Sequence, residues 1–235
     1  IQPMLDVRLF RNTVFTGAIT ANLISMMVDV GFIYFASQHL QLVSGLPPMY
    51  AGILLIPGTL ATIIAGLVIA RVAVHFHPAQ VVSFGLALNA AAFAVLAFLG
   101  AHHDVVIILI FIVLGTGIGI AQTISNDLML SSVPPRKAGA ASAISETSYE
   151  MGAVLGTVII GGMLTAIYRA NVVIPTGLDE TLSNHAHETL GGAVAVASNV
   201  GGEQANQLLS SAFAAFDSGV VVSSAFSAVL MGVMA

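Results

Sequence analysis

Residues 140–168 read AASAISETSYEMGAVLGTVIIGGMLTAIY, and this stretch decides the class of the protein. It is long enough to cross a membrane as a helix, yet it contains two carboxylates, Glu146 and Glu150, about one helical turn apart. A carboxylate at the centre of a membrane helix costs about 2.5–3.5 kcal/mol or more, and two on one face repel each other. We therefore expect this pair to face protein, water or cargo and to mark a functional site.

The composition indicates an integral membrane protein. Of the 235 residues, 57% are hydrophobic and 7% are charged, whereas a soluble domain carries about 25% charged residues. The absence of cysteine excludes disulfides and thiol chemistry. No glycine-rich segment carries a P-loop lysine, and no basic patch predicts nucleic-acid binding. The histidines fall in predicted loops without a second set of ligands, so we expect neither a metal nor another cofactor.

Six apolar runs are long enough to cross a hydrocarbon core about 30 Å thick. Because they lack the period-two alternation of barrel strands, we expect an all-α membrane protein with six transmembrane helices. The runs are Thr13–Ser37, Met49–Ala70, Ala79–Leu99, Val105–Leu130, Ala140–Tyr168 and Ala212–Ala235.

The basic residues fall almost entirely on one side of these runs. Only Arg169 lies on the other side; the remaining five are Arg8, Arg11, Arg71, Arg136 and Lys137. Because cytoplasmic loops are enriched in Lys and Arg, we expect residues 1–12 to be a cytoplasmic lead-in. Residues 13–168 then hold the first five transmembrane helices, and residues 212–235 the sixth. The extracytoplasmic loop 169–211 is long, so we expect it to fold as a helical hairpin.

The first span carries one charge, Asp29, and Asn22, Met26 and Phe32 share its helical stripe. A carboxylate beside thioether and aromatic groups suits an amphipathic cation. We interpret this stripe as the wall of a polar cavity. The alternative is a single buried aspartate that is hydrogen-bonded between helices.

Other polar and small residues in the spans add to the candidate set. On the fourth span, Gln122 and Asn126 repeat at a spacing of four and follow a glycine-rich segment that favours close helix packing. The glycines of the fifth span, which include Gly152 and Gly156, predict a close helix contact too. Asp217, at the outer end of the last run, either caps that helix or pairs with a basic residue such as Arg169.

Several short segments together resemble a known family. They are PMLDVRLF at 3–10, ASQHLQ at 36–41, Ala51-Gly52 with Pro57, KAG at 137–139 and ETSYEMG at 146–152. With them the chain resembles the C-terminal half of the fourteen-helix drug:proton antiporters of the major facilitator superfamily, of the QacA and SmvA type. Two departures are Asp29, where the family has an apolar residue, and Thr62, where some members have an acidic one.

The resemblance implies the C-terminal six-helix bundle of a major facilitator fold, in a bacterial cytoplasmic membrane, from a chain that is incomplete at both ends. It implies proton-coupled efflux of lipophilic cationic drugs, so the partners are protons, such cations, membrane lipid and the missing N-terminal half. We expect Glu150, Glu146 and Asp29 to carry the proton coupling, with Glu150 favoured. The substrate-binding candidates are Asp29, Glu146, Asn22, Met26, Phe32, Gln122, Asn126 and Tyr149.

Two other functions stay open at this point. One is proton-coupled transport of another small solute on the same fold, and the other is a non-transporting membrane subunit. An anionic substrate is disfavoured because the spans contain no basic residue that would offset its charge. A non-transporting subunit has no need of deep carboxylates without partners. An enzyme is not expected.

Overall fold

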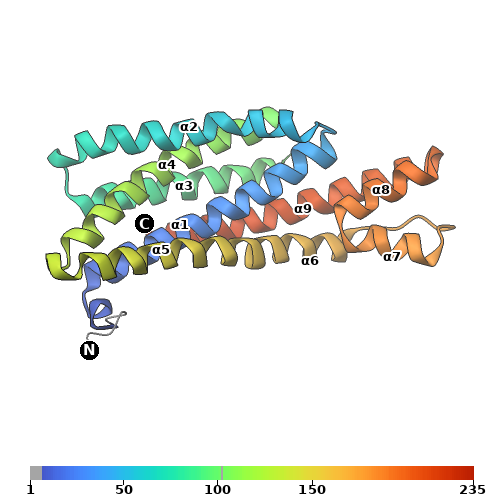
Figure 1. Ribbon diagram of the computed structural model, residues 1–235. Coiled ribbons are helices and arrows are strands. Elements are labelled where there is room, and N and C mark those ends of the chain that lie inside the picture. Colours follow the sequence, from blue (N-terminus) through green and yellow to red (C-terminus); the bar gives the residue numbers. More distant parts are fainter. Residues whose placement is uncertain (1–6, 102) are drawn as a thin grey trace.

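The computed structural model describes residues 7–101 and 103–235, and every regular element in these two ranges is a helix (Figure 1). Asp6, within the segment 3–10 quoted above, and His102, one of the histidines, lie outside the described residues. Six spans in the described part are long and apolar enough to cross a membrane, as predicted. Their helices are α1 (Thr13–Gln38), α2 (Pro48–Val72), α3 (Pro78–Leu99), α4 (Asp104–Ser131), α5 (Ala138–Leu155) continued by α6 (Gly162–Asn171), and α9 (Gly202–Met234).

The helix boundaries follow from local chemistry. The side-chain oxygen of Asn12 begins α1 by accepting a hydrogen bond of 3.0 Å from the backbone N–H of Val14. Pro48 and Pro78 open α2 and α3 in the first turn, where a backbone N–H has no partner within the helix. Gly100 ends α3 with φ of 70°, a left-handed conformation that glycine adopts without steric cost.

Two of the spans contain a π-helical turn. The turn η2 (His39–Val43) extends α1, and η5 (Gly156–Gly161) joins α5 to α6. Such wider turns are rare and occur frequently at functional sites, because they change the direction of the side chains that follow.

The long helices run side by side, so the connections gather at two ends of the bundle (Figure 1). α1 packs against α4 and α5, α2 lies along α4, α3 packs against α4 and α9, and α6 packs against α9. We call the end that holds Arg71, Arg136 and Lys137 the basic end. The opposite end, which holds α7 (Glu180–Glu188) and α8 (Leu190–Val200), is called the hairpin end.

α7 and α8 form a short hairpin that packs against α9 and the end of α6. The Tyr168 hydroxyl at the end of α6 donates a buried hydrogen bond of 2.8 Å to the carbonyl of Ala186 in α7. Arg169 Nε donates one of 3.1 Å to the carbonyl of Glu188. These bonds fix the hairpin to the membrane-spanning part of the chain.

An aromatic cluster fills the core between α1, α3 and α4. The ring centroid of Phe32 lies 4.9 Å from that of Phe35, 6.2 Å from that of Phe93 and 5.0 Å from that of Phe111. Phe32 is 0% exposed. Our expectation that Phe32 lines a polar cavity is therefore corrected. Rings that pack on other rings gain more than the burial of their area alone, and this packing places Phe32 in the core.

Candidate functional site

One amide links three helices in the half of the bundle nearer the basic end. The Asn126 side-chain oxygen, on α4, accepts hydrogen bonds of 3.1 Å from Asn22 Nδ2 on α1 and from Ser145 Oγ on α5. Asn126 Nδ2 donates one of 2.7 Å to the Tyr149 hydroxyl on α5. Because amides and hydroxyls without partners are costly inside a membrane, this network fixes the relative positions of α1, α4 and α5.

The network brings together three of the predicted substrate-binding residues, Asn22, Asn126 and Tyr149. Ser145 was not predicted. Its position one turn before Tyr149 was the available signal, since residues four apart share a helix face. Gln122, which was predicted, is half-buried on α4 one turn from Asn126.

The two glutamates of α5 lie on the opposite side of that helix from its contact with α1. Glu146 and Glu150 are both exposed on the surface of this bundle, together with Met151 and Val154. Within the described part of the chain neither carboxylate has an ion pair. Glu146 is close enough to the Tyr149 phenol for an electrostatic interaction, so the carboxylate pair lies beside the amide network.

Glycines hold α5 directly against α1. A Cβ atom at Gly152 would lie 2.5 Å from the carbonyl oxygen of Leu23 and 2.9 Å from Met26 Cβ, closer than real Cβ contacts. Gly156 approaches the backbone of Met27 in the same way. The predicted close contact of the fifth span is thus confirmed. The contact also shows that α1 and α5 run in the same direction, with Leu23 beside Gly152 and Met27 beside Gly156. Met26 is half-buried at this interface.

Asp29 lies apart from the two glutamates. Because Met27 faces Gly156, Asp29 lies about 12 Å beyond Glu150 toward the hairpin end, at 1.5 Å per residue. It is half-buried, and no hydrogen bond or ion pair involves its carboxylate among the described residues. The three predicted proton-coupling residues therefore form a close pair and one separate carboxylate.

A second group of titratable residues, which the sequence reasoning did not assemble, lies at the hairpin end. It includes His39 in η2, Asp104 in the first turn of α4 and Asp217 in α9. Asp217 accepts a hydrogen bond from the backbone N–H of Ala101, far from the start of α9 at Gly202. Asp217 therefore does not cap α9, and our expectation that it caps this helix is corrected. The described residues contain no group of three or more His, Cys, Asp or Glu side chains that could hold a metal ion.

The sequence matches the family model of the Major Facilitator Superfamily over residues 2–157. The chain belongs to the major facilitator superfamily. Membership of this non-enzymatic family of transporters and the six apolar helices of the described part make the chain a multi-pass membrane protein.

The relatives of the chain within the superfamily include drug exporters. The chain is 46% identical over 230 residues to the multidrug efflux pump LfrA of Mycolicibacterium smegmatis, covering 97% of this chain and 46% of LfrA. It is 31% identical over 237 residues to the methyl viologen resistance protein SmvA of Salmonella typhimurium, covering 98% of this chain and 47% of SmvA. The chain thus spans about half the length of these curated relatives.

Proposed function

We propose that this chain forms the C-terminal half of a proton-coupled antiporter that exports lipophilic cations. Its similarity over nearly its whole length to LfrA and SmvA supports export of drugs as the activity. Since the chain spans about half of these relatives, the proposed transporter also contains an N-terminal half. We call this chain together with that half the complete transporter.

The observation that carries the proposal is the exposure of Glu146 and Glu150 on a membrane-spanning helix. A carboxylate cannot face lipid near the bilayer centre without a large cost, so the face of α5 that carries them must be covered by protein or water. Met151 and Val154 on the same helix are exposed too, with 52% and 61% of their surface accessible. We infer that this face borders a transport path between the two halves.

The charge distribution supports an orientation for the transporter. Arg11, Arg136 and Lys137 belong to the connections at the basic end, and Arg71 lies in the last turn of α2 at the same end. By the preference of Lys and Arg for cytoplasmic loops, the basic end faces the cytoplasm and the hairpin end faces outward. The membrane is then a bacterial cytoplasmic membrane, which agrees with the bacterial relatives.

The proposed mechanism is an exchange at the carboxylates. When deprotonated, Glu146 and Glu150 attract an organic cation; when protonated, they release it. Tyr149 and Asn126 hold α5 in place during this exchange, and Asp29 provides a further negative charge nearer the hairpin end.

The proposed substrate contacts follow from the same placement. Glu146, Asp29 and Met26 have accessible surface, while Asn22, Asn126 and Tyr149 form the polar network behind them. Gln122 extends this set along α4. Phe32 is no longer part of it, because its ring is enclosed in the core.

The test is dye export by the complete transporter in proteoliposomes with an imposed pH gradient. We expect Glu146→Gln and Glu150→Gln to lose gradient-driven ethidium export, since glutamine keeps the size of the side chain and cannot exchange a proton. Glu180→Gln is the matched control, because Glu180 is an exposed residue of α7 far from this site. Full coupled export in both α5 variants would refute the proposal.

A further inference from the structure

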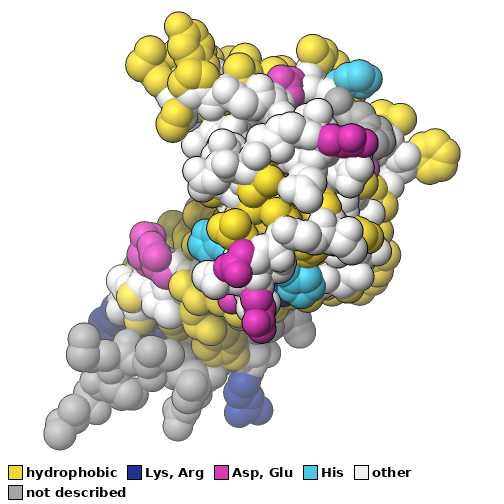
Figure 2. Space-filling view, turned by 90° about the vertical axis from the view of Figure 1, so that its right-hand side faces the viewer, with side chains coloured by type: hydrophobic (Ala, Val, Ile, Leu, Met, Phe, Trp, Pro, Cys, Tyr) yellow, Lys and Arg dark blue, Asp and Glu magenta, His cyan; other side chains and the backbone are white. Residues whose placement is uncertain are grey.

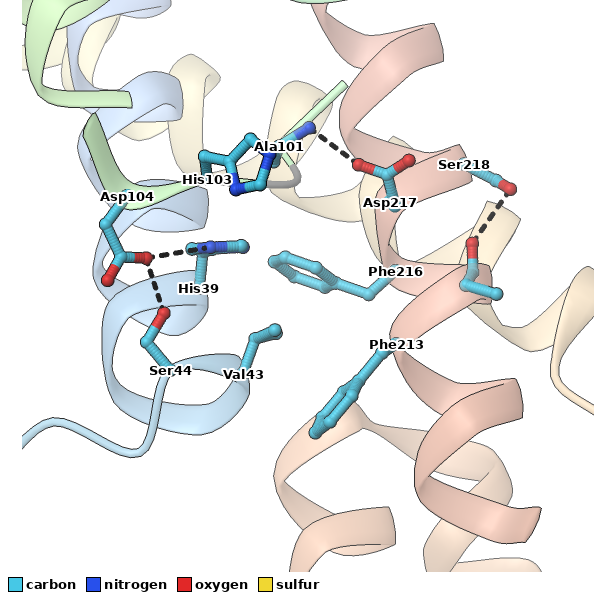
Figure 3. A pocket seen from close by; sticks show the side chains of 11 residues that line it. His39, Val43, Ser44, Ala101, His103, Asp104, Phe213, Phe216, Asp217 and Ser218 are labelled. Atoms are coloured by element: carbon cyan, nitrogen blue, oxygen red, sulfur yellow. Dashed lines mark hydrogen bonds and ion pairs between the residues drawn. The ribbon is translucent and has the colours of Figure 1, made fainter. Parts of the chain in front are cut away.

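A hollow lies at the hairpin end, where η2, the start of α4 and α9 meet (Figure 3). Its volume is about 760 Å³, and sites for small molecules usually measure about 300–1,000 Å³. Its lining includes His39, Ser44, Asp104, Phe213, Phe216 and Asp217. None of these residues is used by the mechanism proposed above.

Two aspartates in this hollow are held in fixed positions by the backbone and by neighbouring side chains. Asp104 Oδ1 accepts a hydrogen bond of 2.5 Å from Ser44 Oγ and lies 3.3 Å from His39 Nε2. Both contacts fall on the same oxygen of Asp104. Asp217 Oδ1 accepts a hydrogen bond of 2.7 Å from the N–H of Ala101. The described residues that line the hollow include no Lys or Arg.

Aromatic rings complete the lining. Figure 3 shows the Phe216 ring lying between α9 and His39, with Phe213 one turn away on the same helix. Phe216 is 2% exposed, whereas Phe213 is only partly buried and presents its ring to the hollow. Carboxylates together with an accessible aromatic face are the groups that bind organic cations.

The surroundings of the hollow favour positive charge as well. The view onto the hairpin end in Figure 2 shows Asp, Glu and His side chains gathered on this surface. The exposed acidic residues that α7 and α9 contribute here include Glu180, Glu188 and Glu203. A surface dominated by one sign of charge raises the local concentration of ions of the opposite sign.

We propose that this hollow is a second binding site for lipophilic organic cations, separate from the carboxylates of α5. The class of ligand rests on the proposed function, while the site itself rests on the hollow and its lining. The site lies beyond Asp29 along α1, at the end where the exported cation would leave. The site therefore binds the exported cation at the outer end of the transport path, before its release.

His39 makes binding at this site depend on pH. An imidazole gains its charge in the range of about pH 5–8, and a charged His39 would form an ion pair with Asp104. The other titratable groups in the lining are His103 and Asp217. Acidification thus adds positive charge on His39 and weakens cation binding. Protons from the outer side would in this way promote release.

The site can be tested by cysteine protection, because the chain contains no cysteine. Ser218 lines the hollow and is exposed, so Ser218→Cys in a cysteine-free complete transporter reports on its occupancy. We expect ethidium at pH 8, at about four times its dissociation constant, to slow the reaction of this cysteine with a membrane-impermeant maleimide about fivefold. The rate without ethidium divided by the rate with ethidium should fall toward one at pH 5.5. Ser198→Cys, exposed on α8 outside the hollow, should show no protection at either pH.

Charge variants separate direct binding from a general effect. Asp104→Asn and Asp217→Asn should each raise the ethidium concentration needed for protection about fivefold. Asp179→Asn should leave it unchanged, since Asp179 is an exposed residue that begins α7 and asparagine is an equally good cap. Protection should persist when Glu146 and Glu150 are both replaced by glutamine.

Two results would overturn the inference. The first is ethidium export without any protection of Ser218→Cys, which removes the exit site and leaves the proposed function in place. The second is equal protection of the cysteines at 218 and 198, which indicates a conformational change instead of a bound cation. Protection without ethidium export would instead contradict the proposed function and keep the site.

Discussion

Replacing Gly152 by alanine tests the close contact between α1 and α5 that positions the glutamates. The added Cβ would lie 2.5 Å from the Leu23 carbonyl oxygen and 2.9 Å from Met26 Cβ. Restoring ordinary van der Waals distances requires the two helices to move apart by about 1 Å. Overpacking of this kind costs about 1–3 kcal/mol, against which alanine regains at most about 1 kcal/mol of helix propensity. We therefore expect a net loss of stability of about 1–2 kcal/mol.

Gly162→Ala is the matched control, because Gly162 belongs to the same span and a Cβ there would meet no atom within 4 Å. We expect it to be neutral or to stabilise by up to about 1 kcal/mol. The measurement is the melting temperature of the purified complete transporter by scanning fluorimetry, with Gly152→Ala melting a few degrees lower than the wild type. Equal melting temperatures for the two glycine variants would refute the account of this interface.

Three further variants test other parts of the fold. Phe32→Ala should destabilise the protein by about 3–5 kcal/mol, as removal of a core ring does, and leave the ethidium affinity of the folded fraction unchanged. Reduced ethidium affinity without reduced stability would show that Phe32 belongs to the binding site. Tyr149→Phe removes the hydroxyl that accepts from Asn126, so thermal unfolding should show a loss of about 0.6–1.7 kcal/mol; no loss would show that the network is not formed. Tyr168→Phe should speed proteolysis within α7 and leave α5 protected, and an unchanged cleavage rate would contradict the anchoring role of its bond to Ala186.

The spans were predictable because hydropathy reports directly on the part of each helix that lies in lipid. The predicted run Val105–Leu130 and the helix Asp104–Ser131 differ by one residue at each end. The prediction Ala212–Ala235 starts well inside α9, which begins at Gly202. The early turns of α9 are polar and pack against α8, outside any apolar run, so hydropathy alone could not place them.

The neighbours that each side chain faces in the bundle were less predictable. Asn22 and Phe32 share a stripe by spacing, but apolar residues lie on every side of α1, so periodicity does not show which side meets another helix. In the structure both are buried, Asn22 against α4 and Phe32 among aromatic rings. The bond between Asn126 and Tyr149 joins two helices and depends on their packing. The hollow around Asp104 and Asp217 joins parts of the chain far apart in sequence, for which no local pattern exists.

The central claim is that Glu146 and Glu150 exchange protons for a cation. The most direct test is the number of protons released when ethidium binds to the purified complete transporter in weakly buffered solution, followed with a pH-sensitive dye. The wild type should release protons on binding near neutral pH, and the variant with both glutamates replaced by glutamine should release fewer or none. Equal release from the two proteins at equal ethidium occupancy would contradict the claim.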